Sequence, residues 1–292
     1  HSRTIAASLN DLSFTKLSSV KSRHTQGRHR MEATRRMLAS ATIFWYILSC
    51  ATLTLVGSQR CNYKSPVHTM CLYKARACPG KQLIRSGGVT KVYQEYIVDM
   101  HNQLRGWVAG GYQKGYPAAV NMKAITWDNE LASIAQRWAD QCTSGHDKNR
   151  DVRQYPVGQN VAVTWSFDDE DNLLDEPDWG SQIYAWYEEC TKGGFKASYI
   201  NPFRFSKSWG HFSQLAWAET SKIGCGYSYF RQKGRGLTKL YVCNYGPGGN
   251  VIGGIMYEKA SRAVCRDGFR QSLNTYLGLC DKDPYYVGTP TR

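Results

Sequence analysis

The stretch IGCGYSYFRQKGRGLTKLYVCNY, residues 223–245, determines much of the expected fold. Apolar and polar residues alternate in residues 223–230 and again in 237–245, a pattern typical of β-strands. The six residues RQKGRG lie between these segments and predict a turn. A hairpin centred on Gly234 places Cys225 opposite Cys243, at the Cα separation that a disulfide needs. We therefore predict an antiparallel hairpin closed by this disulfide.

Three helices are expected before the hairpin. The first begins at Thr90, has apolar residues at helical spacing and ends at Gly110. Asp128 is a suitable N-cap for the second, whose expected buried face extends to Cys142. The third spans about residues 178–190, with two glycines directly after it.

Shorter elements complete the expected order. Residues 160–165 alternate like a strand, and residues 210–217 form a short helix before the hairpin. Helices, a strand, further helices and then a hairpin indicate an antiparallel sheet flanked by helices, which is the α+β class.

The chain is expected to begin with segments that do not belong to the fold. Residues 1–30 precede the first methionine and hold six Lys/Arg against one acid, so we interpret them as disordered or as upstream sequence. Residues 31–58 resemble a signal peptide, with two arginines, an apolar run and then Gly57 and Ser58. The alternative is a membrane anchor of about 20 residues, although serines and threonines dilute the run. We expect a secreted, extracellular protein without stable membrane insertion.

Composition and charge exclude some classes of protein. Removing the eight bases and two acids of residues 1–58 leaves 29 Lys/Arg and 21 Asp/Glu, a net charge of +8. These bases are scattered rather than striped along one helix, which disfavours nucleic-acid binding. The hydrophobic content of 42%, with 9 Trp and 19 Tyr, is sufficient for a packed core and excludes a collagen-like or disordered chain.

The cysteines indicate disulfides, because the chain is expected to be exported. Ten are present, and removing Cys50 with the signal peptide leaves nine, so at least one is unpaired. We predict that Cys61 pairs with Cys71 and that Cys265 pairs with Cys280, since each pair closes a short loop. Cys190 has no local partner and is expected to be free or to link two copies in a dimer.

Four segments in this order resemble the CAP superfamily of cysteine-rich secretory, antigen 5 and pathogenesis-related proteins. They are HNQLR (101–105), GQNV (158–161), GHFSQLAW (210–217) and LYVCNYGPGGNV (240–251). The segments VHTMC (67–71) and QCTSGHD (141–147) add a similarity to arthropod venom allergen 5 and salivary antigen 5 proteins.

This resemblance implies a fold and a domain organisation. The fold is a three-layer α-β-α sandwich, stabilised by disulfides that include one between Cys78 and Cys142. The CAP (SCP) domain would cover residues 88–258. A cysteine-containing extension at 59–87 would precede it, and an extension at 259–292 with one disulfide would follow it.

The resemblance also implies a cleft with two histidines and two acids. Its members here are His146, Gln159, Glu189 and His211, with Gln159 in place of one acid. Imidazoles with a carboxylate suit zinc, and the missing charge predicts weak binding, through His146 and His211. The alternative is that these are ordinary hydrogen-bonded histidines and that Glu189 is a solvated acid. His101 and Arg105 are expected to satisfy buried polar groups, and no catalytic residue is assigned.

The leading functional hypothesis is a non-enzymatic salivary or venom protein that binds a small apolar ligand and modulates host responses. The resemblance implies a sterol, fatty acid or eicosanoid. The abundant Trp and Tyr residues support this only loosely, through an apolar groove that they would line between the first and third helices. The alternative, which the composition favours, is that these aromatic residues belong to the core. One alternative is a metal-dependent hydrolase or protease with Glu189 as base. Another is an interaction module that binds a host receptor or plasma protein. No nucleic-acid partner is expected.

Overall fold

The computed structural model describes residues 61–167, 176–262, 265, 269–271, 276 and 278–282, which all lie in the unit Cys61–Arg292. The expected upstream segment (1–30) and signal peptide (31–58) lie outside these residues, as does much of the C-terminal extension. Among the helices that the structure describes, none combines the length and the apolar character needed to span a bilayer.

The expected hairpin forms the centre of the sheet. Strand β5 (Lys222–Gln232) pairs antiparallel with β6 (Gly236–Gly246), and Cys225 lies opposite Cys243 in this register. Their Cα atoms are 4.1 Å apart and a disulfide joins them. Nearly every hairpin residue is buried, including the polar Ser228, Thr238 and Asn244, because both faces of the sheet are covered. The hairpin prediction is confirmed.

The remaining strands extend the sheet on both sides of the hairpin. Strand β4 (Gly158–Ser166) pairs antiparallel with β6, and β1 (Gln82–Ser86) pairs antiparallel with β5. The order is β1-β5-β6-β4, and β3 (Thr126–Trp127) runs parallel beside β5. Strand β4 is longer than predicted. Neither β1 nor β3 was expected, because such short segments lack a recognisable alternation.

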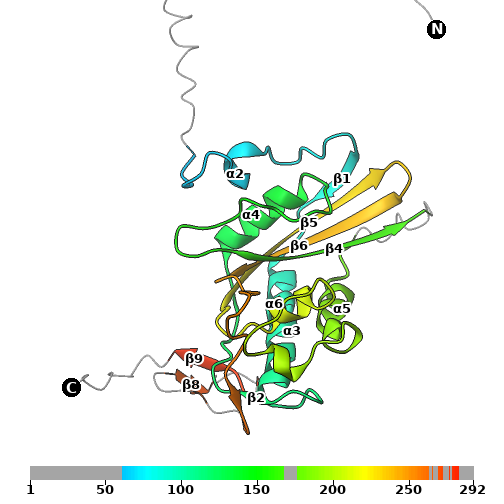
Figure 1. Ribbon diagram of the computed structural model, residues 1–292. Helices are drawn as coiled ribbons and strands as arrows, with labels where there is room; N and C mark the ends of the chain where they lie inside the picture. Colours follow the sequence, from blue (N-terminus) through cyan, green and yellow to red (C-terminus); the bar gives the residue numbers. More distant parts are fainter. Residues whose placement is uncertain are drawn as a thin grey trace, which may run out of the picture. The chain divides into compact units, whose positions relative to one another are not determined.

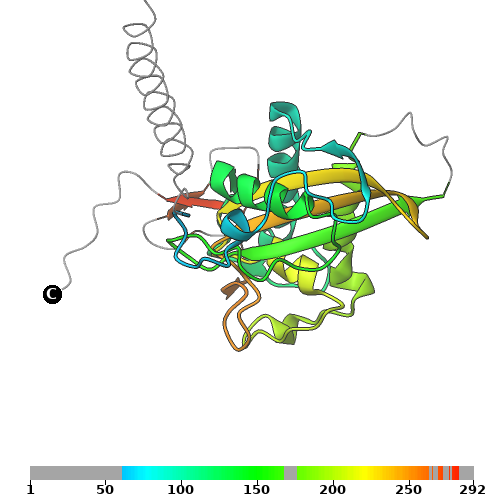
Figure 2. The same ribbon diagram turned by 90° about the horizontal axis from the view of Figure 1, so that it is seen from above.

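Two layers of helices cover the sheet (Figures 1 and 2). One face carries α4 (Asn129–Ala139) and the short α2 (Thr69–Leu72). The other carries α3 (Lys91–Ala109), α5 (Trp179–Lys192) and α6 (Gly210–Leu215), with a 3₁₀ turn at Ala197–Tyr199. The expected three-layer α-β-α sandwich is confirmed.

The three main helices begin where their caps predict. The side chains of Thr90, Asp128 and Asp178 accept hydrogen bonds from backbone N–H groups in the first turns of α3, α4 and α5. Such caps satisfy donors that have no partner within the helix. The second helix is shorter than expected. It ends at Ala139, so Cys142 does not lie on it and instead adopts a φ of +54°.

Two glycines of β5 allow α4 to contact the sheet directly. A Cβ on Gly224 would lie 2.1 Å from the backbone nitrogen of Ala132. A Cβ on Gly226 would lie 2.4 Å from the backbone of Gln136. Since real Cβ atoms do not come so close, only glycine permits this spacing between strand and helix.

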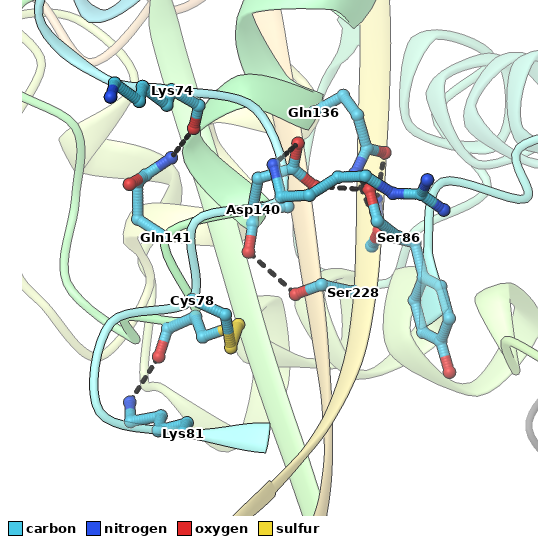
Figure 3. The surroundings of a disulfide bond; sticks show 12 residues. Lys74, Cys78, Lys81, Ser86, Gln136, Asp140, Gln141 and Ser228 are labelled. Carbon is cyan, nitrogen blue, oxygen red and sulfur yellow. Dashed lines mark hydrogen bonds between the residues drawn. A yellow bond between two sulfur atoms is a disulfide. The ribbon is translucent and has the colours of Figure 1, made fainter. Parts of the chain in front are cut away.

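A disulfide and a buried acid attach the N-terminal extension to α4 (Figure 3). Cys78 is bonded to Cys142, and Asp140 lies between this bridge and β1. The Asp140 carboxylate accepts the backbone N–H of Arg76 at 2.8 Å and the amide of Gln136 at 2.9 Å. The side chain is therefore satisfied although Asp140 is only 2% exposed.

Short strands position the C-terminal extension. Strand β2 (Ala118–Ala119) pairs with β7 (Lys259–Ala260), and β8 (Phe269–Gln271) pairs with β9 (Cys280–Lys282). Disulfides join Cys265 to Cys280 and Cys61 to Cys71, so all four expected pairs are present.

Cys190 is the free cysteine of the described residues, and it lies in the core with 3% of its surface exposed. Burial raises the pKa of its thiol. A disulfide between two copies through Cys190 would therefore require helix α5 to open locally.

Candidate functional site

The four residues of the expected cleft come from different parts of the fold. His146 lies in the loop after α4, Gln159 on β4, Glu189 on α5 and His211 on α6. The structure brings them together as two hydrogen-bonded pairs, His211 with Glu189 and His146 with Gln159.

Glu189 fixes both the imidazole of His211 and the start of α6. Its Oε1 lies 2.7 Å from His211 Nδ1. Its Oε2 accepts the backbone N–H groups of His211 and Phe212 at 2.9 and 3.2 Å. Because a carboxylate only accepts, Nδ1 carries a proton, and in the neutral form of the ring the lone pair is at Nε2.

Gln159 performs the corresponding task for His146. Its Oε1 lies 3.1 Å from His146 Nδ1 and accepts the backbone N–H of Asp147 at 3.0 Å. Its Nε2 donates to Asn244 Oδ1 at 3.0 Å. These partners fix the orientation of the amide, so its oxygen faces His146. His146 therefore donates through Nδ1 and keeps Nε2 free as an acceptor.

The surroundings favour the neutral form of His146. Desolvation lowers the pKa of its imidazole, and electrostatic interactions with Arg150 and with His211 lower it further. The hydrogen bond that its Nδ1 donates to Gln159 acts in the opposite direction.

These donors fit only a weak metal site. The described part of the chain contains no group of three or more His, Cys, Asp or Glu residues arranged to hold a metal ion. Glu189 and Gln159 bind the Nδ1 atoms and thus lie behind the rings, where they orient them. The remaining donors are the two Nε2 atoms, which would need water to complete a coordination shell.

A buried chain of hydrogen bonds connects this site to the core. His101 Nε2 lies 2.9 Å from the hydroxyl of Tyr245, and Asn160 Nδ2 donates to that hydroxyl and to the carbonyl of His211. Burial lowers the pKa of His101 to about 4, so the ring is neutral. The sequence assigned His101 to such a role but did not identify Asn160 or Tyr245. Both lie within segments that carry the family resemblance.

Arg105 organises the loop that follows α6. It is fully buried, and its guanidinium donates to backbone carbonyls rather than to an acid. The acceptors are the carbonyl oxygens of Lys123, Leu215, Trp217, Ala218 and Thr220. The expectation that Arg105 satisfies buried polar groups is confirmed.

Exposed apolar side chains flank the contact between α3 and α5. Tyr96 reaches from α3 to α5, since a Cβ on Gly180 would lie 2.6 Å from its hydroxyl. Tyr184 is one turn after Gly180 on the same face of α5, and Val92 is one turn before Tyr96 on α3. Val92, Tyr96 and Tyr184 are 73%, 44% and 51% exposed. We call these three residues with Gly180 the α3–α5 seam.

Comparisons with known proteins agree with this fold. The model of the Cysteine-rich secretory protein family, CAP, matches residues 98–245. Venom allergen 3 of Solenopsis invicta is 39% identical over 234 residues, covering 74% of this chain and 97% of the relative. Venom allergen 5 of Rhynchium brunneum is 36% identical over 232 residues, covering 76% and 97%. Among solved structures, BmVAL-1 is 28% identical with a TM-score of 0.56, covering 70% of this chain and 98% of that one.

Proposed function

Because the chain belongs to the cysteine-rich secretory protein (CAP) family, we propose that it is a secreted, non-enzymatic protein that binds one small apolar ligand. The ligand class is a sterol, a fatty acid or an eicosanoid, and its capture modulates the responses of a host. The names of the relatives support a role in venom. The four disulfides of the described residues and the expected signal peptide support secretion.

The α3–α5 seam is the observation that carries this proposal. Large apolar side chains are ordinarily buried, so several exposed ones along one line indicate a place where a ligand is bound. Trp107 lies further along the same side of α3 and is 53% exposed, although the exposed polar Gln103 separates it from Tyr96. An acyl chain lying along this seam would cover these side chains.

Filling the seam is expected to prevent ligand binding. In a Gly180→Leu variant the Tyr96 hydroxyl, which would lie 2.6 Å from the new Cβ, has to move, and the leucine then covers the surface along which an acyl chain would lie. Each methylene excluded from an apolar site costs about 0.8 kcal/mol, so losing two of them weakens binding more than about tenfold. Titration with a fluorescent fatty acid measures this loss.

Ala185→Leu is the matched control, because it adds the same side chain to α5 at an exposed position that faces away from the seam. It should bind the fatty acid as the wild type does. If Gly180→Leu and Ala185→Leu bind equally well, the ligand does not lie in the seam and this assignment is wrong.

We also propose that His146 and His211 bind zinc weakly through their Nε2 atoms. A bound zinc ion would act there as a Lewis acid. Glu189 and the Gln159 amide would keep both rings in the tautomer that can bind the metal.

Zinc affinity is expected to fall by at least about tenfold in His146→Ala and in His211→Ala, since either change leaves a single imidazole. The zinc affinity should also decrease as the pH decreases, because a protonated ring cannot bind metal and the reference pKa of histidine is about 6.5. Gln159→Glu should strengthen binding by placing a negative charge on the Nδ1–H of His146. Calorimetric titration between pH 5 and 8 tests this. If the zinc affinity is unchanged in both alanine variants, the site is not where we propose it.

The hydrolase alternative gains no support from the geometry. A general base needs a free lone pair directed at water. Both carboxylate oxygens of Glu189 are instead engaged by His211 and by the start of α6.

A further inference from the structure

A basic groove lies at the turn end of the hairpin, on different elements from the α3–α5 seam. It has a volume of about 600 Å³ and runs between the start of β1 and the β5–β6 turn. Its polar lining consists of Lys81, Gln82, Arg231, Gln232 and Lys233, and three glycines complete it. We call this the hairpin groove.

Positive charge dominates the hairpin groove. Three of its lining residues are Lys or Arg, and none of the described lining residues is acidic. Arg235, in the same turn, places its guanidinium 5.2 Å from the ring centre of the half-exposed Trp165. The Lys81 ammonium donates to the carbonyl of Cys142 and lies 5.1 Å from the ring centre of Phe230. Burial lowers its pKa, and the charge of Arg235 lowers it further. An anion in the groove would relieve this repulsion.

The lining also limits the kind of anion. A Cβ on Gly80 or on Gly234 would meet no atom within 4 Å, so the space above both residues is open and a chain-like ligand can pass over them. The lining itself contains no apolar side chain, and the Arg235 guanidinium lies over the ring of the neighbouring Trp165, which disfavours insertion into a bilayer. Its side chains are cations and amides, which suit a water-soluble ligand carrying several anionic groups.

We propose that the hairpin groove binds a sulfated polysaccharide. Lys81 on the β1 side and Lys233 on the turn bind separate sulfate groups along one chain, and Arg235 adds a third cation beside them. The Gln82 and Gln232 amides donate to sulfate or hydroxyl oxygens. This site would hold the secreted protein on a cell surface or matrix, whatever ligand the seam binds.

Heparin affinity tests the proposal on the full chain. The wild type should bind a heparin column at about 0.15 M salt. A Lys81→Gln/Lys233→Gln/Arg235→Gln variant should bind about tenfold more weakly, because it loses the half-buried charge of Lys81 and the two exposed charges of the turn. A Lys233→Gln/Arg235→Gln variant keeps the packing of Lys81 on Phe230 and should show most of this loss.

The control removes the same charge elsewhere. Lys114, Lys196 and Lys207 are exposed and lie outside the hairpin groove, so changing all three to Gln leaves the groove intact. This variant should elute close to the wild type. The proposal is overturned if the control loses as much affinity as the triple variant, because the binding would then follow net charge alone. It is also overturned if the wild type does not bind heparin. The same holds if the variants differ only in binding to vesicles that contain phosphatidylserine and not in binding to heparin.

Discussion

Replacing Arg105 by methionine is expected to destabilise the protein by at least about 3–5 kcal/mol, which is a large part of the stability of a typical domain. Methionine fills a similar apolar volume but donates no hydrogen bond. The carbonyls of Lys123, Leu215 and Thr220 would lose donors that the buried guanidinium supplies, whereas those of Trp217 and Ala218 keep the backbone N–H groups of Thr220 and Lys123. Each buried carbonyl left without a donor costs about 1–3 kcal/mol. Denaturant unfolding followed by tryptophan fluorescence measures the change.

Two further variants make this result interpretable. Arg105→Lys keeps the charge with three donors in place of five, so it should fold with intermediate stability. Gln103→Met introduces the same new side chain at an exposed position of α3 and should change little. If Arg105→Met unfolds within about 1 kcal/mol of the wild type, the carbonyl cluster does not depend on Arg105.

Removing the Cys225–Cys243 disulfide should have the second large effect. We expect the paired alanine variant to lose about 2–5 kcal/mol, the usual range for a native disulfide in a small secreted domain. For a domain of this size this corresponds to a melting temperature lower by roughly 4–20 °C. Both sulfurs are buried at the centre of the sheet, so their loss also leaves a small cavity. Thermal unfolding under non-reducing conditions tests this.

The comparison is the Cys61→Ala/Cys71→Ala variant, which opens a ten-residue loop in the more exposed N-terminal extension. It should melt much closer to the wild type. An unchanged melting curve for the Cys225/Cys243 variant would mean that strand pairing alone holds the hairpin.

The sequence predicted those elements whose signals are local. Alternation over 223–245 specified β5 and β6, and the caps Thr90, Asp128 and Asp178 marked the starts of three helices. Strand β1, QLIRS, has two adjacent apolar residues and no alternation, so its pairing with β5 follows only from the tertiary structure. The same holds for β3, which has two residues.

The site required information that no local pattern contains. The resemblance identified His146, Gln159, Glu189 and His211 as the members of the cleft. It did not show that His146 pairs with Gln159 and that His211 pairs with Glu189. It also suggested that a carboxylate at position 159 would be a metal ligand. The structure places Gln159 on the Nδ1 side of His146, held there by Asp147 and Asn244, so this position acts through the ring.

Native mass spectrometry of the protein secreted by eukaryotic cells tests the central claim most directly, because it detects the mass of a bound ligand whatever its chemical identity. We expect a wild-type species that carries four disulfides and the mass of one lipid. We expect the same species for Ala185→Leu and the chain without lipid for Gly180→Leu. If the wild type has the mass of the chain alone and gains no mass after incubation with sterols, fatty acids or eicosanoids, the protein does not bind such a ligand.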